Sequence, residues 1–171
     1  MKFKIIHIIF ILVLIGCKKS NERKCIKSNG PISDREIQLL KTFDRISLYD
    51  DLNLILIPDS LNYLTVQGPK NLIGLVEIDS SSNELMLSNL NKCNFLRKRK
   101  DIDIHYHYST LKEIDLHGYG SVRNLDEIKH NLTIFCNNAF SIVNLTLNNS
   151  NTSIYKSQGS TEIILRGTCS S

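Results

Sequence analysis

The sequence predicts an all-β protein, a single-domain β-solenoid with a right-handed parallel β-helix-like arrangement of about three 20-residue coils at its C-terminal end. The first observation is an internal repeat. When residues 112–168 are shifted by about 20 positions, Ile114, Ile134 and Ile154 align. The second observation is composition, because strand-forming residues alternate with Gly, Asn and Ser in this repeat. The third is that no stretch of the chain keeps a helical period for longer than about two turns.

Residues 1–16 have the form of a lipoprotein signal peptide. Lys2 and Lys4 make a short positive region, and residues 5–15 form an apolar run interrupted only by one histidine. This run is shorter than the about 20 residues that a membrane-spanning helix needs. Its length fits the apolar core of a secretory signal peptide. It ends in Leu14-Ile15-Gly16-Cys17, which resembles the bacterial lipobox.

Cys17 is therefore the predicted lipidation site, since its thiol would receive the diacylglycerol. Two or three acyl chains hold a protein on a membrane, whereas one chain alone binds marginally. The residues that follow Cys17 are polar but not acidic, which resembles lipoproteins sent to the bacterial outer membrane. We expect a protein that is lipid-anchored there and faces the periplasm or the cell surface. Residues 17–33 are expected to be a flexible tether.

Residues 34–171 are expected to form the folded domain, and its first part reads as a series of strands. The predicted strands cover, in order, residues 43–48, 52–57, 63–67, 75–79, 84–88 and 101–108. Residues 80–83 are a predicted hairpin loop between two of these strands. Short helical or looped turns are expected at residues 72–75 and 125–129.

The coils that follow carry an inward face, because residues two apart on a strand point to the same side. Three pairs of residues fill it: Ile114 and Leu116, Ile134 and Cys136, Ile154 and Lys156. Further aligned columns are Ser121, Ser141 and Thr161; Leu125, Leu145 and Leu165; Val122 and Ile142; Asn124 and Asn144. The charged Lys156 breaks the inward column, and the sequence shows no terminal cap. An open solenoid end of this kind is expected to self-associate.

Four stretches resemble the head GIN domain family of autotransporter adhesins: residues 44–56, 66–73, 91–97 and 111–122. The resemblance implies a β-solenoid of the bacterial cell envelope. The leader, the repeat and the lack of a convergent polar site favour a non-enzymatic role in binding, adhesion or assembly. The resemblance brings no catalytic residue and no cofactor. Family members usually continue for several more coils, so this domain is expected to be cut short.

The resemblance also implies a disulfide between Cys25 and Cys93, because lipoprotein members of the family carry both. Both cysteines lie in polar stretches, and the envelope is a compartment in which disulfides persist. A bridge across so long a loop would stabilise the fold by about 4 kcal/mol in the chain-entropy model. Cys136 is expected to be a small buried hydrophobic residue instead.

One strand carries residues that could bind a metal ion. His105 and His107 would project from the same face about 7 Å apart, and Asp103 could add a third ligand. Because no fourth ligand is identifiable, a solvated strand face is the favoured interpretation. No metal site is predicted.

The charge argues against a nucleic-acid partner. The formal net charge is +4, and it falls to +2 without Lys2 and Lys4, whereas nucleic-acid binding needs a strongly basic face. The favoured function is a lipid-anchored envelope protein that binds a polysaccharide, a protein or further copies of itself. The alternative is a polysaccharide-cleaving β-helix enzyme. That enzyme would need acidic groups converging on one face, and only Asp101 and Asp103 beside the two histidines offer them.

Overall fold

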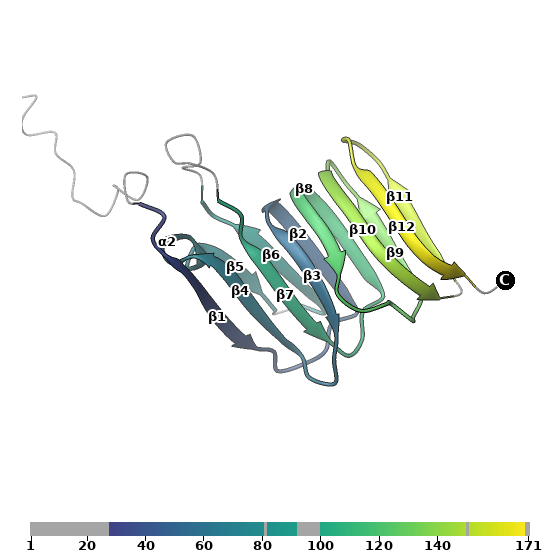
Figure 1. Ribbon diagram of the computed structural model, residues 1–171, viewed down its shortest axis with the longest axis horizontal. Coiled ribbons are helices and arrows are strands. Elements are labelled where there is room, and N and C mark those ends of the chain that lie inside the picture. The colour runs from purple at the N-terminus through teal and green to yellow at the C-terminus, as the bar shows by residue number, and fades with distance from the viewer. Residues whose placement is uncertain (1–27, 81, 92–99, 150, 170–171) are drawn as a thin grey trace, which may run out of the picture.

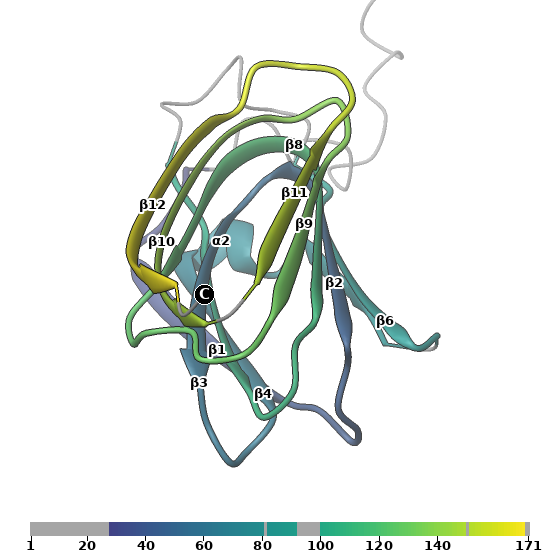
Figure 2. The ribbon, with the colours of Figure 1, turned by 90° about the vertical axis from the view of Figure 1, so that its right-hand side faces the viewer.

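The computed structural model describes residues 28–80, 82–91, 100–149 and 151–169 (Figure 1). Their strands join into one twelve-stranded sheet, so the prediction of an all-β, single-domain protein is confirmed. The sheet is open and curls on itself like half of a barrel, as the end-on view in Figure 2 shows. A solenoid of three coils stays a prediction.

The curled sheet has two sides, here called the front wing and the back wing. The front wing consists of β1 (Ile32–Gln38), β4 (Tyr63–Pro69), β7 (Asp103–Tyr108), β3 (Asn53–Pro58), the second half of β8 (Glu113–Asn124), β10 (Phe140–Asn149) and β12 (Glu162–Cys169). The back wing consists of β5 (Val76–Asp79), β6 (Glu84–Asn89), β2 (Arg45–Asp51), the first half of β8, β9 (Leu132–Cys136) and β11 (Thr152–Lys156). The bent strand β8 crosses from one wing to the other and thereby joins them (Figure 2).

The strands predicted before residue 110 are all present, with boundaries shifted by a few residues. β5 and β6 pair antiparallel, as expected for the hairpin around residues 80–83. The short helix α2 (Lys70–Ile73) overlaps the short helical or looped turn expected at residues 72–75 and begins two residues earlier. The sequence did not predict β1, which pairs antiparallel with β4. β1 begins at Ile32, inside the stretch that the sequence assigns to the tether.

The repeat is visible as parallel pairing between successive strands. Ile114 pairs with Ile134, and Ile134 pairs with Ile154, as the aligned column predicted. Leu145 and Leu165 also pair as predicted.

Part of the alignment was wrong by one residue. Val122 pairs with Val143 rather than with Ile142. The reason is the corner at residues 137–139: Leu116 still pairs with Cys136, but Tyr119 pairs with Phe140. The corner between β9 and β10 stacks on the bend of β8. It therefore contains one residue more than that bend.

The corners need backbone conformations that few residues adopt. Asp50 and Asn138 have φ angles of 64° and 54°, and Gly120 in the bend of β8 has a φ of 133°. A Cβ atom on Gly120 would lie 2.0 Å from the carbonyl oxygen of Leu52 in the preceding corner. Backbone therefore stacks directly on backbone at the bend, and only glycine fits there.

The core lies between the two wings and is filled by the inward side chains of both. Buried hydrophobic residues run from Phe43 to Leu147. Cys136 belongs to this core, as predicted, and burial raises the pKa of its thiol. The core is less well covered at β11 and β12, where the inward-facing Leu165 is 42% exposed and Lys156 is exposed. In the described part of the chain, β11 pairs only with β9, and β12 only with β10.

Candidate functional site

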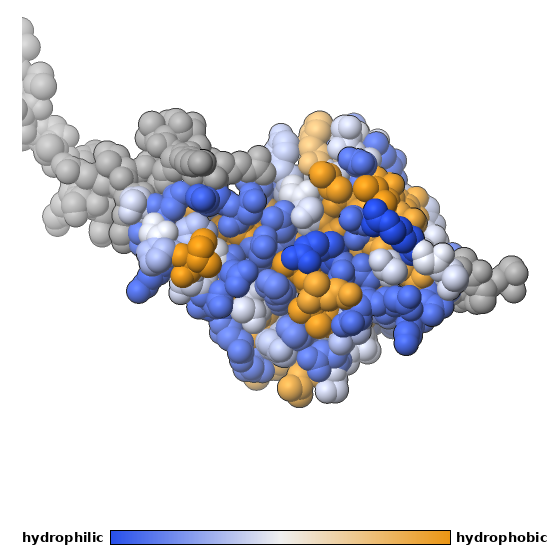
Figure 3. Space-filling model, viewed as in Figure 1, coloured by the Kyte–Doolittle hydropathy of each residue, from blue (hydrophilic) through white to orange (hydrophobic). Residues whose placement is uncertain are grey.

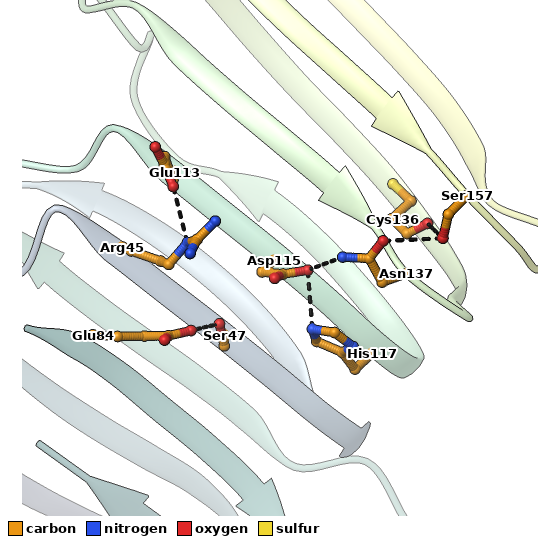
Figure 4. A network of polar contacts seen from close by, with 9 residues as sticks. All are labelled: Arg45, Ser47, Glu84, Glu113, Asp115, His117, Cys136, Asn137 and Ser157. Carbon is orange, nitrogen blue, oxygen red and sulfur yellow. Dashed lines mark hydrogen bonds and ion pairs between the residues drawn. The ribbon is translucent and has the colours of Figure 1, made fainter. Parts of the chain in front are cut away.

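The outer face of the back wing carries a connected set of polar side chains (Figure 4). They come from neighbouring strands, because pairing in parallel register places outward residues side by side. The Asn137 amide donates to Asp115 Oδ1 at 2.8 Å. The Ser157 hydroxyl in turn donates to Asn137 Oδ1 at 3.0 Å. This chain of hydrogen bonds fixes the Asp115 carboxylate from one side.

Two further carboxylates on this face are also held by neighbours. Arg45 Nε lies 2.9 Å from Glu113 Oε2 across the paired strands β2 and β8. The buried hydroxyl of Ser47 donates a hydrogen bond to Glu84. The Arg45 guanidinium also lies over the ring of Phe135, 5.4 Å from its centroid. The acidic groups are thus part of a fixed surface.

His117 connects this network to an aromatic pair. Its Nε2 atom lies 3.0 Å from Asp115 Oδ1, and its ring stacks on Tyr49 with centroids 4.7 Å apart and planes 8° apart. Burial raises the pKa of Tyr49, and the carboxylates of Glu84 and Asp115 raise it further. The Tyr49 hydroxyl therefore stays protonated at neutral pH and can donate a hydrogen bond.

A groove of about 430 Å³ opens beside this pair of rings. Its walls come from the strands β2, β5, β6 and β8, and its lining residues are Tyr49, Asp50, Glu77, Asp79, Met86, Ser88 and His117. The groove combines flat aromatic surface with carboxylate and hydroxyl oxygens. Such a combination can bind a ligand that has both apolar faces and hydrogen-bond donors.

The front wing presents a mixed outer face (Figure 3). Its exposed aromatic residues Tyr119 and Phe140 stack on each other, with ring centroids 5.5 Å apart. Ile142 lies next to them along β10 and is 48% exposed. Asp103, His105 and His107 lie on the same wing, on the outward side of β7.

The structure does not bring these three residues together as a metal site. Asp103 Oδ1 accepts a hydrogen bond from the Asn53 amide at 2.8 Å. His107 Nδ1 lies 2.9 Å from Asp59 Oδ2, which lowers the pKa of Asp59. Burial lowers the pKa of His105. Among the described residues, no group of three His, Cys, Asp or Glu side chains could hold a metal ion.

The remaining predicted site residues, Cys17, Cys25 and Cys93, lie outside the described residues. Within the described ranges, no helix has the length and apolar character needed to cross a membrane.

Sequence reasoning missed the site on the back wing. Arg45 lies on a predicted strand and Tyr49 directly follows it, but Tyr49 and His117 are far apart in the chain and meet only because β2 pairs with β8. The one indication available in the sequence was the alternation within residues 113–117, which places Asp115 and His117 on the face opposite to Ile114.

Two solved structures share this fold. One is a "putative adhesin" from Bacteroides fragilis, with a TM-score of 0.65 and 20% identity over 78% of this chain and 61% of that one. Another, from Parabacteroides distasonis, is titled "putative lipid binding protein"; it has a TM-score of 0.51 and 18% identity over 83% of this chain and 69% of that one. This chain thus spans about 61% of the length of the Bacteroides protein.

A comparison with curated proteins found no significant match. A family model does match, over residues 42–171, and its description is "Putative auto-transporter adhesin, head GIN domain". The match covers most of the chain and includes every strand from β2 to β12. The chain therefore belongs to the head GIN domain family.

Proposed function

We propose that this protein is a lipid-anchored, non-enzymatic binding protein of the bacterial cell envelope. The observation that carries the proposal is the state of two carboxylates at the centre of the back wing, Glu113 and Asp115. Glu113 is paired with Arg45, and Asp115 is held by both Asn137 and His117. Glycoside hydrolysis uses a pair of carboxyl groups, one of which transfers a proton, and neither Glu113 nor Asp115 is left unpaired for that role. Fixed carboxylates beside exposed rings form a rigid recognition surface instead.

The same proposal includes the finer architecture. We interpret the two halves of β8, β9 with β10, and β11 with β12 as the three stacked coils of a right-handed β-helix-like solenoid. The parallel pairing of Ile114, Ile134 and Ile154 supports this arrangement. Stacked coils present flat, extended outer faces, which suit the recognition of polymers such as envelope polysaccharides or proteins.

The lipid anchor is part of the proposal and is tested at Cys17. Cells that express the wild-type protein are expected to incorporate labelled palmitate into it and to retain it in the outer-membrane fraction. The Cys17→Ala variant is expected to lose the label, because its side chain has no thiol to acylate. A serine substitution at Cys25, which leaves the lipobox intact, serves as the matched control. Equal labelling of wild type and Cys17→Ala would contradict the anchor.

Protease treatment of whole cells distinguishes a protein that faces the cell surface from one that faces the periplasm. Loss of the protein would indicate the cell surface, and protection would indicate the periplasm. The disulfide between Cys25 and Cys93 remains part of the proposal, and the same preparations would reveal it as a mobility difference between reduced and non-reduced samples.

We further propose self-association through the strands β11 and β12. Each has a backbone edge without a strand neighbour in the described residues, and Leu165 on the inward side of β12 is 42% exposed. Open edges and exposed apolar groups favour pairing with another copy. Sedimentation velocity in detergent is expected to show a larger species as the protein concentration rises, and Leu165→Lys is expected to reduce it. Leu61→Lys, at a loop residue that is 64% exposed, is the control. A monomer at all concentrations would contradict this contact.

A further inference from the structure

The groove beside Tyr49 has the size of a small-ligand site. Its volume of about 430 Å³ lies within the range typical of such sites, about 300–1,000 Å³. Four strands contribute to its walls, and they are paired side by side in the order β5, β6, β2, β8. A groove on such a paired sheet keeps its shape, because the backbone of every wall is held by ladder hydrogen bonds.

One wall is a rigid aromatic platform. Tyr49 and His117 stack nearly parallel, with centroids 4.7 Å apart. His117 is held by Asp115, and Asp115 by Asn137, at distances of 3.0 and 2.8 Å. The platform is therefore oriented before any ligand arrives, which lowers the entropic cost of binding. A sugar ring offers flat patches of C–H groups that pack on such a surface.

Polar and acidic side chains surround the aromatic platform. The carboxylates of Asp50, Glu77 and Asp79 and the hydroxyl of Ser88 line the same groove. Ionised carboxylates only accept hydrogen bonds, so they suit the many hydroxyl donors of a sugar. They also repel phosphate, sulfate and uronic acid groups. Met86 adds an adaptable apolar contact. The ligand that fits all of these features is neutral, rich in hydroxyl groups and flat on at least one side.

We propose that this groove binds a neutral glycan chain, with the ring of Tyr49 as the stacking surface and Glu77 and Asp79 as acceptors for its hydroxyl groups. This inference rests on the proposed binding function, since it names the ligand class for the same wing. A basic peptide is the competing ligand class, because it would also be attracted by the carboxylates. A lysine ammonium can also lie over the ring of Tyr49, but it covers less of the flat surface than a sugar ring does, so hexalysine is included in the test.

The test uses the full-length protein purified in detergent. Isothermal titration calorimetry is performed with hexasaccharides of β-1,4-glucose, β-1,3-glucose, α-1,6-mannose and β-1,4-N-acetylglucosamine. At least one is expected to bind, and Tyr49→Ala is expected to weaken that binding at least 10-fold. Tyr49→Phe keeps the ring and is expected to retain most of the affinity. Glu77→Gln is expected to weaken binding about 3-fold, because the side chain loses its charge and one acceptor.

Tyr155→Ala is the matched control. Tyr155 is 57% exposed on the same wing and stacks on Phe135, with centroids 5.2 Å apart, but it does not line the groove. Its removal is expected to leave glycan binding unchanged. If none of the four glycans binds at 10 mM, or if Tyr49→Ala binds as wild type does, the inference is overturned. Tighter binding of hexalysine than of any glycan would overturn it in favour of the peptide.

These outcomes are separable from the failure of the proposed function. Glycan binding that does not depend on Tyr49 would leave the binding function in place. It would contradict only the assignment of the groove as the glycan site. Release of new reducing ends during the titration would instead contradict the non-enzymatic function. Equal palmitate labelling of wild type and Cys17→Ala would contradict only the anchor.

Discussion

Replacing Gly120 by alanine is expected to lower the free energy of unfolding by about 3 kcal/mol or more. Two independent effects add. Gly120 has a φ of 133°, which residues with a Cβ atom rarely adopt. The new Cβ would also lie 2.0 Å from the carbonyl oxygen of Leu52, and backbone cannot move away as a flexible side chain can. The two corners must therefore separate, and the pairing of β8 with β3 on the front wing weakens.

Chemical denaturation followed by far-ultraviolet circular dichroism measures this cost. For a chain of this size, a loss of about 3 kcal/mol corresponds to a fall in Tm of about 6–12 °C. Gly74→Ala is the control, because a Cβ there meets nothing within 4 Å and φ is −72°. Its stability is expected to stay within about 0.5 kcal/mol of wild type. Equal stability of the two variants would show that the bend of β8 tolerates a side chain.

Replacing Ile134 by alanine is expected to cost about 2–5 kcal/mol. Ile134 is fully buried and lies between Ile114 and Ile154 in the inward column of the back wing. Its truncation would leave a cavity that neighbours on paired strands cannot fill, because ladder hydrogen bonds fix their positions. Equilibrium unfolding in urea gives the change in free energy.

The Ile154→Ala variant tests whether the loss of unfolding free energy depends on the position of the isoleucine in the inward column. It removes the same atoms from the next strand, where Ile154 is only partly buried and packs at the margin of the core. Its expected cost is less than half of that at Ile134, because less apolar surface returns to water. Equal costs at the two positions would mean that β11 covers the core better than its exposure indicates.

The strands could be predicted largely because their inward residues alternate with polar ones. Strand β7 is the clearest example, since Ile104, Tyr106 and Tyr108 are buried while the histidines between them point outward. β1 escaped prediction because its sequence, ISDREIQ, has polar residues on both sides. Its inward Arg35 instead donates a hydrogen bond to the carbonyl of Val76. A strand that satisfies its inner face by polar contacts leaves no apolar alternation to detect.

The repeat predicted which residues stack but not how the corners are built. A period read from one column assumes corners of equal length, and the extra residue at positions 137–139 breaks that assumption. Asn138, with a φ of 54°, turns the chain at this point. The φ of a corner residue depends on the backbone beneath it, which only the assembled structure supplies.

The candidate site was hidden for a related reason. Spacing along one strand made His105 and His107 visible in the sequence, whereas Tyr49 and His117 belong to separate strands. Their contact depends on which strands are neighbours. In a sheet whose order departs so far from chain order, that information is contained in the long-range pairing. Local patterns predicted the elements, and tertiary pairing created the site.

The shared strand β8 also determines how the molecule comes apart. It has partners on both sides in both wings: β2 and β9 in one, β3 and β10 in the other. Because both wings pair with β8, its loss would disrupt both of them at once. The unfolding of the two wings is therefore coupled through β8, which lies in the middle of the sheet. The molecule should lose order from β11 and β12 inward, with the amide hydrogens of β8 the last to exchange with solvent.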